Sequence, residues 1–244
     1  MGTIPEARHT YAYLNTAYPA LNEKQLAIGE TTFGGPDTLV NPKGLFTIEE
    51  LERVALQRCT TAREAIKLMG ELAQKYGYGD SGECLTLADP KEVWQFEILG
   101  CGKDEIGAVW AARRIPDDHV GVSANIPRIG SINRKDKNYC MASDNVEAVA
   151  RKYGLWDGKG EFVFWRAYNC DYAKGRNFHD REFFSVIEHL SDYERHIVVH
   201  DLRHIILAYH PVYPLIEFDL SDLSNPFADD RYTVRIVLII LFPV

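Results

Sequence analysis

Two helix-start signals, each followed by a one-sided apolar stripe, constrain the fold of this chain more than any other feature. Thr47-Ile-Glu-Glu50 and Thr61-Ala-Arg-Glu64 are capping boxes, in which the Thr hydroxyl takes the N3 amide and the Glu carboxylate reaches back. Apolar residues then recur at helical spacing: Leu51, Val54, Ala55 and Cys59 after the first box, and Ala65, Met69, Leu72 and Tyr76 after the second. Gly77 is a natural stop. The sequence therefore predicts two consecutive amphipathic helices.

Strand-like runs lie on both sides of this helix pair. They are predicted at 9–15, 25–33, 83–88, 92–99, 106–114 and 119–124, with turn residues between them. Within EVWQFEI at 92–98, Trp94, Phe96 and Ile98 alternate with polar residues and are predicted to be buried. Further helices are expected at 144–153 and near Asp180. This order of strands, helix pair, antiparallel-looking strands and helix predicts an α+β layered domain.

The composition is that of an ordinary globular protein. Hydrophobic residues make up 46% and charged residues 25% of 244 residues, which excludes a disordered, collagen-like or coiled-coil chain. Lys plus Arg number 27 and Asp plus Glu 35, giving a net charge of −8. An acidic chain without a basic block binds nucleic acid poorly, so no nucleic-acid partner is expected. The five cysteines are widely spaced and form no CxxC, which disfavours a disulfide framework and a structural zinc site.

No part of the sequence predicts a membrane partner. The longest apolar run, 236–244, is about half the ~18–20 residues that a membrane-spanning helix needs. The N-terminal residues contain no apolar signal-peptide region, and a cytoplasmic location is expected on that ground alone. Assembly into a homo-oligomer is left open.

The last 60 or so residues differ in character from the rest. Five of the eight His residues lie there, namely His189, His196, His200, His204 and His210, and no Lys follows Lys174. The chain ends in an apolar segment without a polar tail. We therefore predict one domain over 1–184 and a divergent C-terminal segment over 185–244.

Several phrases recur in an order typical of one family. They are LNEKQLAIGETTFGG at 21–35, RCTTAREA at 58–65, GECLTLAD at 82–89 with EVWQFE at 92–97, GAVWAARRIPDDHVGVSAN at 107–125, and WDG at 156–158. Together they closely resemble the cysteine dipeptidases of the N-terminal-nucleophile hydrolases, which are relatives of the penicillin V acylases and bile salt hydrolases. The resemblance covers about 10–184, roughly three quarters of the chain.

The resemblance implies a four-layer αββα sandwich and hydrolysis of dipeptides without a metal or other cofactor. In the family, the mature enzyme begins with a cysteine whose own α-amino group serves as the base. Such an amino group has a pKa near ~7.7–8.0 and can exchange a proton at neutral pH. The thiolate is the nucleophile, and water then releases the acyl group.

This chain departs from the family at the nucleophile. It enters the family pattern at about 9–13, and none of its cysteines is N-terminal. Cys59 is expected at a helix end, Cys84 in a strand, Cys101 between glycines, and Cys140 and Cys170 in loops. Each is expected to be an inert or buried thiol. We therefore predict a dipeptidase-like fold that is incomplete at its N-terminus and inactive alone.

The resemblance also implies roles for four residues. Thr32 occupies the position of an oxyanion-hole residue that is usually Asn, and its hydroxyl can donate one hydrogen bond. Asn125 resembles the family's second oxyanion Asn, with the capping of a turn as its alternative. Arg181 resembles an arginine beside the nucleophile, or else forms a helix-surface ion pair. Glu30 could receive a substrate amino group, although a charge at the sheet edge is the favoured interpretation.

Two further functions compete with dipeptide hydrolysis. A non-catalytic remnant would bind a peptide or a partner chain without turnover. His196, His200 and His204, at helical spacing with Asp192 or Glu194 nearby, could bind zinc or copper, but we predict no metal site because a solvated His stripe has the same spacing. Another small amide, such as a bile acid conjugate, remains an alternative substrate that the phrases favour less than a dipeptide.

Overall fold

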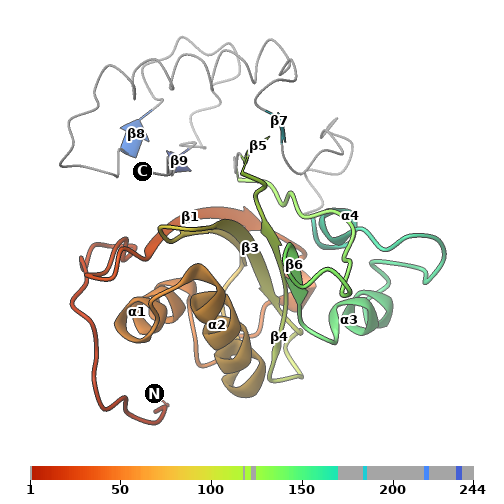
Figure 1. The fold of residues 1–244 in the computed structure, drawn as a ribbon. Helices are drawn as coiled ribbons and strands as arrows, with labels where there is room; N and C mark the ends of the chain where they lie inside the picture. Colours follow the sequence, from red (N-terminus) through yellow and green to blue (C-terminus); the bar gives the residue numbers. More distant parts are fainter. Residues whose placement is uncertain are drawn as a thin grey trace.

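The computed structural model describes residues 2–117, 119–121 and 125–169, together with short strands at 184–185, 217–219 and 235–237 (Figure 1). Predictions that fall elsewhere, including the helix near Asp180, Cys170, Arg181 and the His stripe, lie outside these residues. Within them, no helix has both the length and the apolar character needed to cross a membrane.

A five-stranded antiparallel sheet forms the centre of the fold. Its strand order is β1-β2-β3-β4-β6, which follows the order of the chain with β5 left out. The strands are β1 (Ala27–Gly34), β2 (Gly82–Ala88), β3 (Val93–Gly100), β4 (Ala108–Arg114) and β6 (Cys140–Ala142). Two smaller pairings join β5 (His119–Val120) to β7 (Phe184–Ser185), and β8 (Glu217–Asp219) to β9 (Arg235–Val237).

One face of the sheet is covered by the predicted helix pair. Helix α1 (Ile48–Arg58) and helix α2 (Ala62–Tyr76) both begin at capping boxes, as predicted. Gly77 ends α2 with φ of +87°, the left-handed conformation that glycine adopts without strain. A short 3₁₀ helix, η1 (Asp37–Leu39), precedes the pair. Residues Ile66 and Met69 of α2 pack with Trp94, Phe96 and Ile98 of β3 in one hydrophobic cluster, which confirms the predicted buried face.

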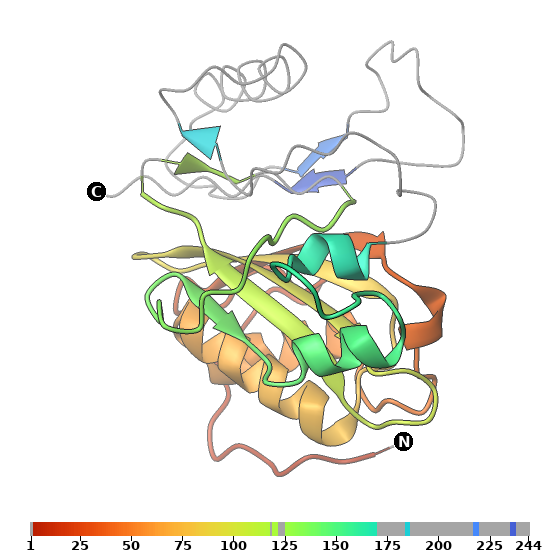
Figure 2. The same cartoon turned by 90° about the vertical axis from the view of Figure 1, so that its right-hand side faces the viewer.

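The opposite face is covered as well. Helix α3 (Val146–Lys152) and helix α4 (Phe164–Tyr168) contribute to a second cluster with Leu99 and Val109. Gln95 and Glu97, on the polar side of β3, are buried too, and Glu97 Oε1 accepts the amide of Ile129 at 3.2 Å. The two views show the sheet between the two helix pairs (Figures 1 and 2). The described residues thus have an α+β fold, as predicted.

Three local features differ from the sequence-based predictions. The strand predicted at 9–15 is wrong: Tyr13 makes a single bridge to Asn22, and the rest of that run pairs with no strand. Cys140, predicted in a loop, begins β6, where it pairs with Arg113. Helix α4 was not predicted. Both missed elements are short, and their formation depends on packing against the sheet more than on local pattern.

Candidate functional site

Strand β1 places two of the predicted site residues on one side of the sheet. Because side chains alternate along a strand, Glu30 and Thr32 share the face on which Ile28 packs against the helices. Thr32 lies opposite Glu83 of β2 in the antiparallel register. Directly opposed residues point to the same face, so Glu83 lies beside Glu30 and Thr32.

Hydrogen bonds join three of the four residues that the resemblance selects. The Asn125 side chain donates from Nδ2 to the carbonyl oxygen of Thr32 at 2.8 Å, and the Thr32 hydroxyl donates to Glu30 Oε1 at 3.0 Å. Asn125 has φ of +55°, a left-handed conformation that Asn tolerates better than most residues. Its amide reaches a strand 93 positions away instead of its own turn. The fourth residue, Arg181, lies outside the described residues.

Glu83 is a buried carboxyl group that is only partly satisfied. It is 3% exposed, and the Ser81 hydroxyl donates to its Oε1 at 3.2 Å, whereas its Oε2 has no hydrogen-bond partner in the described part of the chain. Burial raises the pKa of Glu83 to about 10, helped by its hydrogen bond with Glu30 and by the Glu30 charge, with a hydrogen bond from the Thr32 hydroxyl opposing. Glu83 is therefore protonated at neutral pH.

Two more buried polar side chains come from the neighbouring elements. Glu52 of α1 is fully buried, and neither of its carboxyl oxygens has a partner among the described atoms. Burial raises its pKa well above the ordinary value, and the charges of Glu30 and Glu49 add to the effect. The Tyr78 hydroxyl is also fully buried and unpartnered in the described chain. We call Glu30, Glu52 and Glu83 the acidic cluster.

Sequence reasoning found Glu30 but missed Glu52, Glu83 and Tyr78. The available signal for Glu52 was its position: it follows Ile48 by four residues and precedes Ala55 by three, which places a carboxylate within the apolar stripe of α1. Glu83 stood in a matching phrase, but only the register of β1 against β2 sets it opposite Thr32.

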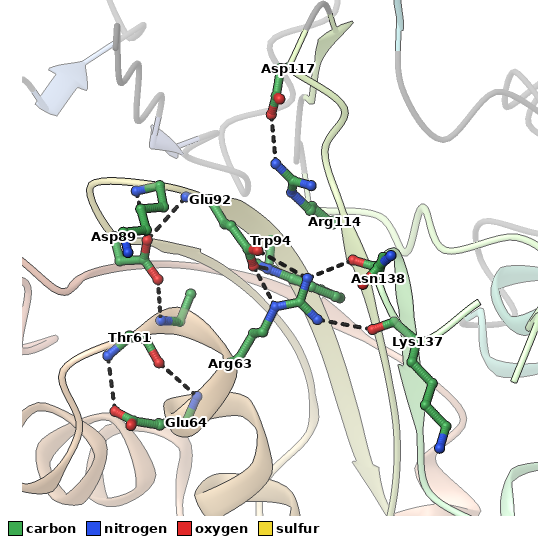
Figure 3. Close-up of polar contacts among 12 residues, drawn as sticks. Thr61, Arg63, Glu64, Asp89, Glu92, Trp94, Arg114, Asp117, Lys137 and Asn138 are labelled. Carbon is green, nitrogen blue, oxygen red and sulfur yellow. Dashed lines mark hydrogen bonds and ion pairs between the residues drawn. The ribbon is translucent and has the colours of Figure 1, made fainter. Parts of the chain in front are cut away.

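A second polar cluster lies at the other end of β2, and there the groups are paired (Figure 3). Arg63 of α2 forms a two-pronged ion pair with Glu92, with Nε to Oε2 at 2.7 Å and Nη2 to Oε1 at 3.0 Å. Its guanidinium also donates to the carbonyl oxygens of Lys137 and Asn138 and stacks 4.6 Å from the Trp94 ring centroid. Trp94 Nε1 donates to Glu92 Oε2 at 2.7 Å. We call Arg63, Glu92 and Trp94 the Arg63 cluster.

Asp89 connects the Arg63 cluster to the start of α2 (Figure 3). Its Oδ2 accepts the amide of Ala62 at 2.8 Å, and its Oδ1 accepts the amides of Lys91 and Glu92 at 2.8 and 3.0 Å. One carboxylate thus satisfies an unpaired helix-start amide and the turn between β2 and β3.

The described cysteines are not suited to nucleophilic attack. Cys59, Cys84, Cys101 and Cys140 are all buried free thiols, as expected. Burial raises the pKa of Cys59 to about 12 and that of Cys101 to about 11. Because the thiolate is the reactive form, such thiols react slowly at neutral pH. Among the same described residues, no three His, Cys, Asp or Glu side chains are grouped to hold a metal ion.

Comparison with known proteins identifies relatives. A family model described as "Peptidase family C69" matches residues 1–212. A protein of Salmonella dublin named "Probable dipeptidase" is 34% identical over 148 residues, which is 58% of this chain and 32% of that protein. A "Probable dipeptidase" of Latilactobacillus sakei is 29% identical over 191 residues, 72% of this chain and 39% of the relative.

A third relative has the same printed function. "Probable dipeptidase B" of Streptococcus pyogenes serotype M1 is 34% identical over 119 residues, covering 48% of this chain and 22% of the relative. The chain thus spans well under half the length of the curated relatives it matches. The family match also passes residue 184, and the domain boundary there stays a prediction.

Proposed function

Because the chain belongs to peptidase family C69, we propose that it carries the substrate-holding side of a dipeptide-hydrolysing site. The relatives named as dipeptidases support a peptidase-type function, and a peptide is the substrate class that follows from it. The observation that carries the proposal is the hydrogen-bonded series from Asn125 to Thr32 to Glu30, since it joins three residues that the sequence had already singled out.

Each member of this series has a role in the proposed reaction. Asn125 Nδ2 bears two hydrogens, and its bond to Thr32 uses one, so the other can be donated to the oxyanion that forms when a peptide carbonyl is attacked. The Thr32 hydroxyl donates to the carboxyl groups beside it, Glu30 at 3.0 Å, so Thr32 acts here by positioning. Glu30 receives the amino group of the substrate. Arg181 remains a proposed support for the nucleophile.

The nucleophile in this proposal is the family's N-terminal cysteine, acting with its own α-amino group as the base. None of the four cysteines in the described part of the chain fits that role, because all four are buried and two have strongly raised pKa values. We therefore propose that this chain alone binds dipeptides but does not hydrolyse them. The same observation favours the alternative of a peptide- or partner-binding protein without catalysis.

The proposed architecture is the four-layer αββα sandwich of the N-terminal-nucleophile hydrolases. The five-stranded sheet with α1 and α2 on one face supports two of these layers. In that architecture the second sheet would pack on the face of the first sheet that lies opposite α1 and α2. The described residues of that face contact α3 and α4, so the sandwich rests on the family resemblance.

An activity and binding assay on the purified 244-residue chain tests the proposal. The probe is Ala-Ala, with amino-acid release followed before and after treatment with iodoacetamide, and with binding followed by calorimetry up to millimolar peptide. We expect saturable binding without turnover. Turnover that iodoacetamide blocks would contradict the proposed inactivity, and the absence of both binding and turnover would contradict the dipeptide proposal.

Variants of asparagine sharpen the assay. Asn125→Ala is expected to weaken Ala-Ala binding about threefold to tenfold, because it removes one hydrogen bond to the peptide carbonyl. The exposed Asn15 gives the matched control, and Asn15→Ala is expected to bind as the wild type does. Equal binding by both variants would remove Asn125 from the site.

A further inference from the structure

We infer that the pocket between the N-terminal segment and helix α1 is a binding site for one free α-amino acid with an apolar side chain. Four apolar and two oppositely charged side chains line it, namely those of Ile4, Leu45, Phe46, Val54, Glu50 and Arg53. The residues of the proposed dipeptide site are not among them. Free amino acids are the products of dipeptide hydrolysis, and only this link to the reaction rests on the proposed function.

The N-terminal segment forms one wall of the pocket and is tied to the end of α1 (Figure 1). Arg58 Nη2 donates to the carbonyl oxygen of Pro5 at 3.0 Å. The amide of Tyr11 donates to the carbonyl oxygen of Gln57 at 2.9 Å. These bonds hold the segment against the helix, so the pocket is a fixed feature of the described fold.

The size and the lining of the pocket suit a compact apolar group. Its volume is about 180 Å³. An apolar cavity of about 150 Å³ holds one molecule of benzene, whereas pockets for drug-sized ligands measure about 300–1,000 Å³. Phe46 is buried, and Ile4, Leu45 and Val54 are half-buried, so together they offer an apolar floor. The pocket therefore fits the side chain of a single amino acid.

The two charged side chains of the pocket come from one face of α1, yet no ion pair joins them in the described chain. Glu50 and Arg53 have the i, i+3 spacing that makes side chains neighbours on a helix. The Glu50 carboxylate instead accepts the Thr47 amide at 3.0 Å, as part of the capping box. Arg53 is half-buried, its charge acts on Glu52, and its guanidinium makes no hydrogen bond within the described residues.

A zwitterion satisfies both charges at once. The guanidinium of Arg53 can hold a carboxylate through two parallel N–H···O bonds, and the free oxygen of Glu50 can accept from an ammonium group. A ligand with a carboxylate alone would bring its charge close to Glu50, and a ligand with an ammonium group alone would bring its charge close to Arg53. An α-amino acid carries both groups on one carbon atom beside its side chain, which matches the lining.

Calorimetry on the full 244-residue chain tests the inference. The ligands are leucine, N-acetyl-leucine, which lacks the ammonium group, leucinamide, which lacks the carboxylate, and glycine, which lacks the side chain. We expect leucine to bind saturably at millimolar concentration and each of the other three to bind at least about tenfold more weakly. Equal binding of leucine and any one of them would overturn the inference.

Two variants remove the charges and are expected to fold. Arg53→Gln removes the guanidinium, and Glu50→Gln keeps an acceptor oxygen, because Gln serves in a capping box as Glu does. Each is expected to weaken leucine binding at least about tenfold. Arg8 is an exposed arginine of the same N-terminal segment, and Arg8→Gln is the matched control, expected to bind leucine as wild type does. Unchanged leucine binding in Arg53→Gln would overturn the inference.

The pocket and the dipeptide site can fail separately. Because the two sites share no residue, saturating leucine is expected to leave the affinity for Ala-Ala unchanged. Leucine that binds only in competition with Ala-Ala would place leucine in the dipeptide site and overturn the pocket inference. Leucine binding that persists when Ala-Ala does not bind would support the pocket and contradict the dipeptide proposal. Absence of leucine binding would overturn the pocket inference, whatever Ala-Ala does.

Discussion

The two ends of β2 hold buried or half-buried carboxyl groups in opposite conditions. At the end of the strand, Asp89 and Glu92 accept hydrogen bonds from two segments of backbone and from Arg63 and Trp94. At its start, Oε2 of Glu83 and both carboxyl oxygens of Glu52 are buried and have no hydrogen-bond partner among the described residues. Paired carboxylates stabilise a fold, whereas unpaired buried ones reduce its stability. The two ends of β2 are therefore expected to contribute to stability with opposite signs.

The same contrast is visible in the pKa values. Burial alone would raise the pKa of Glu92, but hydrogen bonds from Arg63 and Trp94 and the charges of Arg63 and Arg114 outweigh it, so the pKa is lowered. Burial raises the pKa of Glu83 to about 10, and Glu30 adds to that rise. The stability contributions of these two carboxyl groups therefore respond to pH with opposite signs.

Loss of Arg63 should produce the largest effect. Arg63→Ala removes the two-pronged ion pair, two bonds to backbone carbonyls and the contact with Trp94, and it leaves Glu92 without its cation. We expect a loss of about 2–4 kcal/mol in the free energy of unfolding, less than for a fully buried pair because both side chains are partly exposed. Urea unfolding measures it.

The control for that experiment is on the same helix. Lys67 of α2 is exposed, and Lys67→Ala should change the free energy of unfolding by less than about 0.5 kcal/mol. A loss in Arg63→Ala no larger than in the control would show that this end of β2 is not what holds the helix to the sheet.

In contrast to Arg63→Ala, Glu83→Gln should increase the free energy of unfolding at pH 8. Between about pH 4.5, the ordinary value, and about pH 10, the folded chain keeps a proton that the unfolded chain releases, so wild-type stability falls as pH rises through that window. The variant lacks this loss, and we expect it to be about 1–3 kcal/mol more stable than wild type at pH 8. Urea unfolding at pH 4 should show nearly equal stabilities. A variant less stable than wild type at pH 8 would contradict the inference that the buried Glu83 carboxyl reduces the free energy of unfolding at that pH.

Asp89→Asn should cost less than the loss of Arg63. The amide keeps one acceptor oxygen and replaces the other by a donor, so either the Ala62 amide or the turn amides lose their partner. We expect a loss of about 1–2 kcal/mol in the free energy of unfolding. Asp104 is exposed, and Asp104→Asn is the control without effect. Thermal unfolding of the two variants side by side would reveal an equal change if Asp89 has no capping role.

The smallest effect is expected for Tyr78→Phe. The Tyr78 hydroxyl has no partner among the described residues, so its removal should change the free energy of unfolding by less than about 0.5 kcal/mol. Tyr168 is equally buried but its hydroxyl donates to the carbonyl of Val146, and Tyr168→Phe should lose about 1 kcal/mol. Denaturant midpoints of the two variants compare them directly. Equal losses would mean that the Tyr78 hydroxyl has a partner after all.

The sequence predicted the parts of the fold that depend on local pattern. Two capping boxes and a terminal glycine located α1 and α2, and alternation located β3 and its buried face. Prediction from the sequence failed where strand formation depends on pairing with another strand. The run at 9–15 alternates like a strand but makes only one bridge among the described residues. The three-residue β6 forms because it pairs with the edge of β4.

The residues of the candidate site were likewise predicted only in part. The resemblance selected Thr32, Asn125 and Glu30, and the structure brings them into one hydrogen-bonded series. Glu52 and Glu83 were not foreseen, because their burial depends on the register of β1 against β2 and on the way α1 packs over both. These neighbours are set by strand register and helix packing, which cannot be read from the spacing of residues along the chain.

Urea unfolding at pH 8 of two variants from the two ends of β2 tests the central claim most directly. The claim is that the buried carboxyl group of Glu83 reduces the stability of the fold, whereas the paired carboxylate of Glu92 increases it. We expect Glu83→Gln to be about 1–3 kcal/mol more stable than wild type. Glu92→Gln should be less stable than wild type, because it loses its ion pair with Arg63. A Glu83→Gln variant that loses stability as Glu92→Gln does would contradict this claim.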